Sequence, residues 1–90
     1  MSQGLLGGNP AEMQQMATQF TQQSEAVRAT MAVLDREAAK VGTAWTGSGA
    51  ERFGSAWQNY RAAFQRMSEE LAEAARVINT YRGNIESATR

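Results

Sequence analysis

The sequence predicts an all-α fold: a long antiparallel helix-turn-helix hairpin, dimerising into a four-helix bundle. Three observations predict it. Two long stretches carry apolar residues at steps of three and four, a cluster of helix-breaking residues separates them, and neither Pro nor Gly occurs between residues 11 and 41. A chain of 90 residues has room for one small domain, so residues 1–90 are expected to form a single helical hairpin.

The first helix is expected over about residues 10–44, after a flexible tail at residues 1–8. Asn9 can accept hydrogen bonds from the first free N–H groups of a helix, and Pro10 suits the first helical position. The larger apolar residues that follow fall on one face of a helix roughly 50 Å long. These residues are Met13, Met16, Phe20, Val27, Met31, Leu34, Val41 and Trp45, with Ser24 (or Gln23) and Ala38 filling the gaps.

The turn is expected at residues 45–48. Gly47 can adopt the positive φ that ends a helix and reverses the chain. Ser48 and Glu51 have the spacing of a capping box, which starts the next helix. Because so short a link joins the helices, they should be antiparallel neighbours.

The second helix is expected over about residues 49–82, and residues 83–90 are expected to form a C-terminal tail after Gly83. Its apolar stripe repeats every 3.5 residues, which indicates coiled-coil-like packing. The stripe consists of Ala50, Phe53, Trp57, Tyr60, Phe64, Met67, Leu71, Ala74, Ile78, Tyr81 and Ile85.

The two stripes are predicted to pack on each other, and also on a partner. In an antiparallel hairpin, residue i should face roughly residue 94 minus i, which places Phe20 opposite Ala74 and Val41 opposite Phe53. Both stripes are wider than a two-helix contact needs, so a second hairpin should cover the remainder. The residues expected in hairpin and dimer packing are Phe20, Val27, Met31, Leu34, Val41, Phe53, Trp57, Tyr60, Phe64, Met67, Leu71 and Ile78.

Composition argues against catalysis and against several classes of ligand. The chain has no Cys and no His, its formal net charge is zero, and Lys40 is its one lysine. We therefore expect no enzyme, no cofactor, no metal site, no small-molecule substrate and no nucleic-acid partner. The first ten residues lack the basic and apolar regions of a cleaved signal peptide, and no apolar run is long enough to span a membrane.

Trp45 and Gly47 form a Trp-x-Gly motif between two helical stretches, with Phe53 eight residues after Trp45. An isolated Trp here could simply cover the end of a hairpin. The motif at mid-chain, in about a hundred residues, resembles the Trp-x-Gly, hundred-residue family of type VII (ESX) secretion substrates, the early-secretory-antigenic-target-like proteins. The resemblance covers about residues 10–83.

The resemblance implies helical hairpins that form a homodimer, or a heterodimer with a related protein. It implies that the cell exports them folded from the cytoplasm, without a cleaved signal peptide, through a machine driven by an FtsK/SpoIIIE-like ATPase. In that family the Trp-x-Gly turn of one subunit pairs with a Tyr-x-x-x-Asp/Glu motif of the other. Here Ile85 stands four residues after Tyr81, and the acid follows at Glu86.

This departure leaves two possibilities open: a partner supplies the fuller signal, or Tyr81, Ile85 and Glu86 form a variant of it. Tyr81 could also be only the last core aromatic residue of the second helix. The function expected is that of a non-catalytic secreted effector or structural subunit. A cytosolic hairpin adaptor or chaperone is the alternative, and a membrane-active amphipathic protein is less consistent with the neutral charge.

Overall fold

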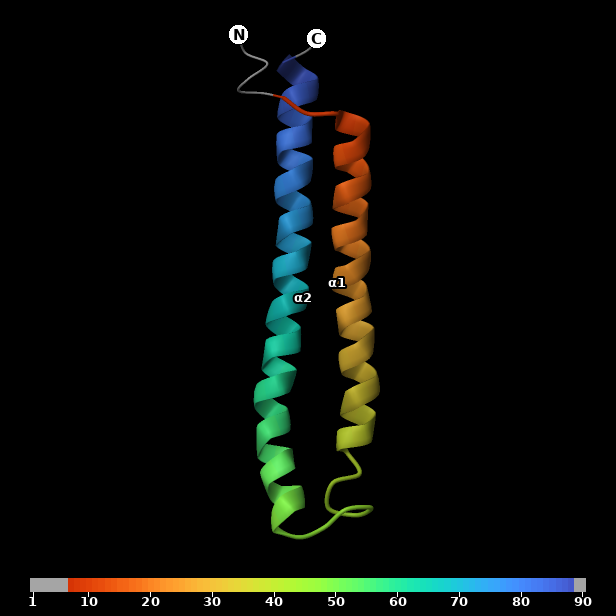
Figure 1. Ribbon diagram of the computed structural model, residues 1–90, viewed down its shortest axis with the longest axis vertical. Helices are drawn as coiled ribbons and strands as arrows, with labels where there is room; N and C mark the ends of the chain where they lie inside the picture. Colours follow the sequence, from red (N-terminus) through yellow and green to blue (C-terminus); the bar gives the residue numbers. More distant parts are fainter. Residues whose placement is uncertain (1–6, 89–90) are drawn as a thin grey trace.

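The computed structural model describes residues 7–88, which form an antiparallel hairpin of two helices, α1 (Pro10–Ala38) and α2 (Ser48–Ala88). Figure 1 shows the helices side by side, with the loop at one end and the start of α1 beside the end of α2 at the other. The molecule measures 66 × 17 × 12 Å. The predicted all-α hairpin is confirmed, and no strand occurs within residues 7–88.

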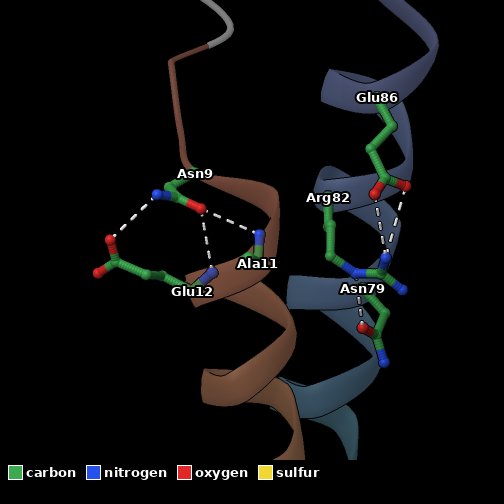
Figure 2. Close-up of polar contacts among 6 residues, drawn as sticks. All are labelled: Asn9, Ala11, Glu12, Asn79, Arg82 and Glu86. Carbon is green, nitrogen blue, oxygen red and sulfur yellow. Dashed lines mark hydrogen bonds and ion pairs between the residues drawn. The ribbon is translucent and has the colours of Figure 1, made fainter.

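α1 begins as its sequence predicts. The Asn9 side-chain oxygen accepts hydrogen bonds from the backbone N–H groups of Ala11 (3.0 Å) and Glu12 (3.2 Å), and the Asn9 amide donates to the Glu12 carboxylate (Figure 2). Pro10 occupies the first helical position, where it has no donor to lose. The cap thus satisfies two of the free N–H groups at this end.

α1 ends at Ala38, so the expectation of a helix to residue 44 was wrong. The backbone N–H groups of Lys40 and Val41 bond to the carbonyls three residues earlier, which tightens the last turn, and Gly42 then adopts a φ of +100°. Gly enters the left-handed region without strain, so the chain can change direction here. Gly42 therefore turns the chain shortly after the helix ends, and the connection spans residues 39–47, which is longer than expected.

α2 begins at Ser48, which is a helical residue and not the cap. The Glu51 N–H donates to the Gly47 carbonyl at 3.1 Å, so Gly47, with a φ of +104°, stands before the first turn. The predicted capping box of Ser48 and Glu51 is not formed among the hydrogen bonds of residues 7–88. Glu51 still lies in the first turn, where the helix dipole favours a carboxylate.

α2 continues to Ala88, so the expected tail at residues 83–90 was also wrong within the described residues. A side chain at Gly83 would meet nothing within 4 Å, and the helix passes through this position unbroken. Ile85 is buried, because it packs where the chain crosses from Gly8 into α1. This burial compensates for the poor helix propensity of Gly83-Asn84. The predicted tails at residues 1–6 and 89–90 lie outside the described residues.

The predicted stripe of α2 divides between two faces. We call the α1-facing set the inner seam: Ala50, Gly54, Trp57, Arg61, Phe64, Ser68, Leu71, Ala75, Ile78, Arg82 and Ile85, all buried or half-buried. One residue step turns a helix by about 100°. A second set, the outer seam, therefore faces away from α1: Phe53, Ala56, Tyr60, Ala63, Met67, Glu70, Ala74, Val77, Tyr81 and Asn84.

Several residues expected in hairpin or dimer packing lie on the outer seam. Tyr60 is 55% exposed and Met67 49%, and Phe53 is also exposed. On α1, Met16 is exposed, whereas its neighbour Ala17 is buried. Small and polar residues occupy the contact instead because they allow the two helices to approach closely. The other predicted packing residues lie between the helices: Trp57 is buried, and Phe20, Val27, Met31, Leu34, Val41, Phe64, Leu71 and Ile78 are half-buried.

A polar contact at mid-length fixes the register of the two helices. The Ser24 hydroxyl donates to the Ser68 carbonyl at 2.7 Å, and the Ser68 hydroxyl donates to the Ser24 carbonyl at 3.2 Å. Arg28 Nε also donates to Ser68 Oγ at 2.7 Å. The predicted relation places residue 70 opposite Ser24, so the observed register lies within two residues of it.

Candidate functional site

The loop that carries the Trp-x-Gly motif is closed by its own backbone. The Gly42 N–H donates to the Trp45 carbonyl at 2.7 Å, and the N–H groups of Thr43 and Ala44 donate to the Lys40 carbonyl at 3.1 and 2.9 Å. The Thr43 hydroxyl donates to the same carbonyl at 3.1 Å. These bonds use the backbone of Trp45 and leave its side chain uninvolved in the turn.

The Trp45 side chain lies against the first turns of α2. A Cβ on Gly49 would lie 3.4 Å from Trp45 Cζ2, so the indole passes close over this glycine. The rings of Trp45 and Phe53 are 5.7 Å apart between centroids and tilted by 53°, a favourable aromatic geometry. Gly49 and Phe53 are four residues apart and therefore share one face of α2. Trp45 is held in place yet remains 48% exposed.

A mainly apolar cavity of about 210 Å³ lies beside Trp45, where α1, the loop and α2 meet. Its apolar lining comes from Leu34, Val41, Trp45, Phe53 and Trp57, and Glu37 and Lys40 also border it. These last two form an exposed ion pair of 2.9 Å. The exposed part of the Trp45 indole and the cavity beside it are thus accessible to an apolar group of a partner.

The opposite wall of this cavity is fixed by a polar clamp between the helices. Asp35 accepts a hydrogen bond from Trp57 Nε1 at 2.9 Å through one oxygen and from Arg61 Nε at 2.8 Å through the other. The Arg61 hydrogen bond is the main cause of the lowered pKa of Asp35, with smaller contributions from the Trp57 hydrogen bond and the Arg61 charge; partial desolvation opposes them. The clamp joins the last turns of α1 to the buried Trp57.

The other predicted export residues lie at the far end of the hairpin and differ in accessibility. Tyr81 is 58% exposed on the outer seam, whereas Ile85 is only 7% exposed. The Glu86 carboxylate lies 3.4 Å from Arg82 (Figure 2). Ile85 is therefore a packing residue in this chain, and Tyr81 is the most exposed member of the set.

The structure does not bring the two halves of the predicted export signal together within one chain. Trp45 and Gly47 lie at the loop end, and Tyr81, Ile85 and Glu86 lie near the open end of a molecule 66 Å long (Figure 1). Only another chain, packed in the opposite direction, could place a tyrosine motif beside Trp45.

Comparison with protein families decides the relationship. The model of the family described as proteins of 100 residues with WXG matches residues 7–88. The chain belongs to the WXG100 family. No curated protein and no solved structure matched in the corresponding comparisons. The resemblance inferred from Trp45 and Gly47 is thereby confirmed over nearly the whole chain.

Membership places this WXG100 protein among small helical proteins that type VII systems secrete, a family without enzymatic activity whose members commonly form dimers with related proteins. Within residues 7–88, neither α1 nor α2 has a stretch that is both long and apolar enough to cross a bilayer. Across the same residues, no three acidic side chains gather in a group that could hold a metal ion.

No local pattern in the sequence indicated the Asp35 clamp or the packing of the Trp45 indole over Gly49. The predicted antiparallel relation places Asp35 opposite residue 59, midway between Trp57 and Arg61 on one face of α2. This relation could have predicted the clamp. Gly49 looked like a turn residue, because nothing in the sequence shows which ring passes over it.

Proposed function

We propose that this WXG100 protein is a non-catalytic subunit that a type VII secretion system exports as a folded hairpin paired with a second hairpin. In this proposal the exposed side of Trp45 and the adjacent cavity form a recognition contact for the export machinery or for the partner's tail. An FtsK/SpoIIIE-like ATPase drives the export, and the protein then acts outside the cell by binding.

The observation that carries the proposal is that the backbone and the side chain of Trp45 have separate roles. The Trp45 carbonyl closes the loop through Gly42, while the large apolar side chain remains about half exposed. Exposed aromatic residues held in a fixed orientation are typical centres of protein recognition. A residue needed only for the turn would not require an indole at this position.

Tyr81 is proposed as the accessible part of the second half of the signal. It lies on the outer seam, directly before Arg82, which pairs with Glu86. In an antiparallel pair, Tyr81 of one chain approaches the loop end of the other. The proposal therefore assigns Ile85 to packing within the chain and leaves Tyr81, with Glu86, for recognition.

The test is the export of a Trp45→Ala variant from a strain with an active type VII system. We expect the variant to accumulate folded in the cell, with wild-type helicity, and to be lost from the culture supernatant. Val33→Ala is the matched control, because Val33 is an equally exposed apolar residue, on α1. Normal export of Trp45→Ala would refute the recognition role, and unfolding of the variant would show that the indole is structural.

A further inference from the structure

α2 is longer than α1 at the open end of the hairpin. Ser24 faces Ser68, and the same antiparallel relation places Pro10 opposite residue 82. Residues 83–88 therefore extend past the first residue of α1, by about 9 Å at the rise of an α-helix. Figure 1 shows this end of α2 beyond the start of α1, with the segment that precedes α1 crossing it. The last turns of α2 thus have no helical turn of α1 opposite them.

Residues 7–9, which we call the strap, lie against this part of α2. A Cβ on Gly8 would be 2.9 Å from Ile85 Cδ1 and 2.9 Å from Met13 Sδ, which is closer than a Cβ normally approaches another atom. The strap backbone therefore rests directly on these two side chains. Ile85 is only 7% exposed, although it lies past the start of α1.

The cap of α1 fixes the point at which the strap joins the helix. Asn9 has an extended backbone (φ −104°, ψ 107°), and its side chain accepts hydrogen bonds from the N–H groups of Ala11 and Glu12 (Figure 2). The chain before Pro10 therefore leaves the direction of α1. Gly8 does not have a positive φ, so the property that suits it to this position is its small size.

The end of α2 has little else to hold it in a helix. Gly83 and Asn84 are poor helix formers, and the last turn carries no basic residue to compensate the helix dipole. The pair of Arg82 and Glu86, at 3.4 Å, is partly exposed and should contribute little. Among the described residues, the burial of Ile85 under the strap is therefore the main tertiary contact that keeps this end helical.

We propose that the strap is a positioning device, which keeps the last turns of α2 helical and thereby fixes the direction of Glu86 relative to Tyr81. In a helix, residues five positions apart differ by about 140° around the axis, so these two side chains point to different sides of α2. Release of the strap would uncoil residues 83–88 and remove this relation. The inference rests on the proposed function in taking Tyr81 and Glu86 as recognition residues, and it adds a coupling between the two ends of the chain.

Gly8→Val tests the strap, because it places a branched side chain where even a single Cβ is too close. NMR of the full chain should show that the amides of residues 85–88 exchange with solvent roughly tenfold faster than in the wild type, while the amides around Ser68 keep their rates. Ala11→Val is the matched control, since it adds a branched side chain at an exposed position of α1 at the same end. Equal effects of the two substitutions, or unchanged exchange in Gly8→Val, would refute the strap.

A stronger helix end should replace the strap. Gly83→Ala introduces a better helix former at a position where a Cβ meets nothing within 4 Å. The chain that carries both Gly8→Val and Gly83→Ala should therefore regain slow exchange at residues 85–88. Exchange as fast as in Gly8→Val alone would show that the strap does not act through the helicity of this end.

Export of the same chains tests the positioning role. Gly8→Val should lower the amount of protein in the culture supernatant, and adding Gly83→Ala should restore it. Wild-type export of a Gly8→Val chain whose helix end is frayed would overturn the role. The exchange measurements need no export machinery, so a negative result there leaves the role of Trp45 standing, and normal export of Trp45→Ala would leave the strap standing.

Discussion

Asp35 of α1 accepts a hydrogen bond of 2.9 Å from the indole N–H of Trp57 on α2. Trp57 is only 7% exposed, so few water molecules could replace this acceptor. The second Asp35 oxygen accepts a hydrogen bond from Arg61, and this bond joins two charged groups. One carboxylate therefore makes two hydrogen bonds across the helix interface. Asp35 thereby fixes the wall of the cavity next to Trp45.

Asp35→Asn should lower the stability of the hairpin, because an amide presents only one oxygen and cannot accept both hydrogen bonds as a charged group does. The expected result is a lower midpoint in urea denaturation followed by circular dichroism, together with a change in tryptophan fluorescence. Glu37→Gln is the control, since the only ion pair that Glu37 makes is an exposed one, with Lys40 three residues later in the connection. Equal effects of the two substitutions would show that the clamp adds nothing.

Acid should remove the contribution of Asp35 to stability. Its pKa in the folded protein is lowered, mainly by the Arg61 hydrogen bond. A carboxyl group whose folded pKa is depressed stabilises the fold above its unfolded pKa, and this contribution is lost as the pH falls through the folded value. Wild-type stability should therefore fall below about pH 4. The Asp35→Asn variant should lose less stability over this range, and parallel curves for the two proteins would contradict the assignment.

Two glycines should respond in opposite ways to substitution by alanine. Gly47 has a φ of +104°, so Gly47→Ala should destabilise the protein by about 1–2 kcal/mol through backbone strain. Gly83 lies inside α2 with open space around it, so Gly83→Ala should stabilise the protein by about 0.5–1 kcal/mol. Urea denaturation measures both changes. A stabilising Gly47→Ala would refute the assigned loop geometry.

Tyr81 and Ile85 should separate export from packing. Tyr81→Ala removes a mostly exposed side chain and should impair export while leaving the thermal midpoint of the hairpin nearly unchanged. Ile85→Ala removes a buried side chain and should cost about 2–4 kcal/mol of unfolding free energy. The comparison is cleaner than deleting residues 83–90, which would remove Ile85 together with any signal. Normal secretion of Tyr81→Ala would exclude Tyr81 from the signal.

Local patterns were sufficient for the fold class, the start of α1 and the approximate register. A 3.5-residue apolar repeat predicts a helix from residue spacing alone. The Asn9 cap of α1 also depends only on hydrogen bonds between residues within four positions of each other. The Trp-x-Gly motif at mid-chain was also sufficient for the family, which the match over residues 7–88 confirms.

The helix boundaries required the tertiary structure. Gly42 and Gly47 can both adopt positive φ. The sequence could not show that α1 ends at Ala38 and that the chain turns at Gly42, because this depends on how the loop closes onto Trp45. Gly83 should weaken a helix, yet α2 continues past it because burial of Ile85 against the start of α1 outweighs local propensity.

The sequence by itself determined that this chain is a two-helix hairpin with apolar stripes too wide for two helices, since periodicity depends only on residue spacing. Only the tertiary structure decided which half of the α2 stripe faces α1. Residues one step apart differ by about 100° around a helix. The choice between Phe53 and Gly54, or between Met67 and Ser68, thus depends on contacts such as Ser24–Ser68 and Asp35–Trp57, which join residues that are distant in the chain.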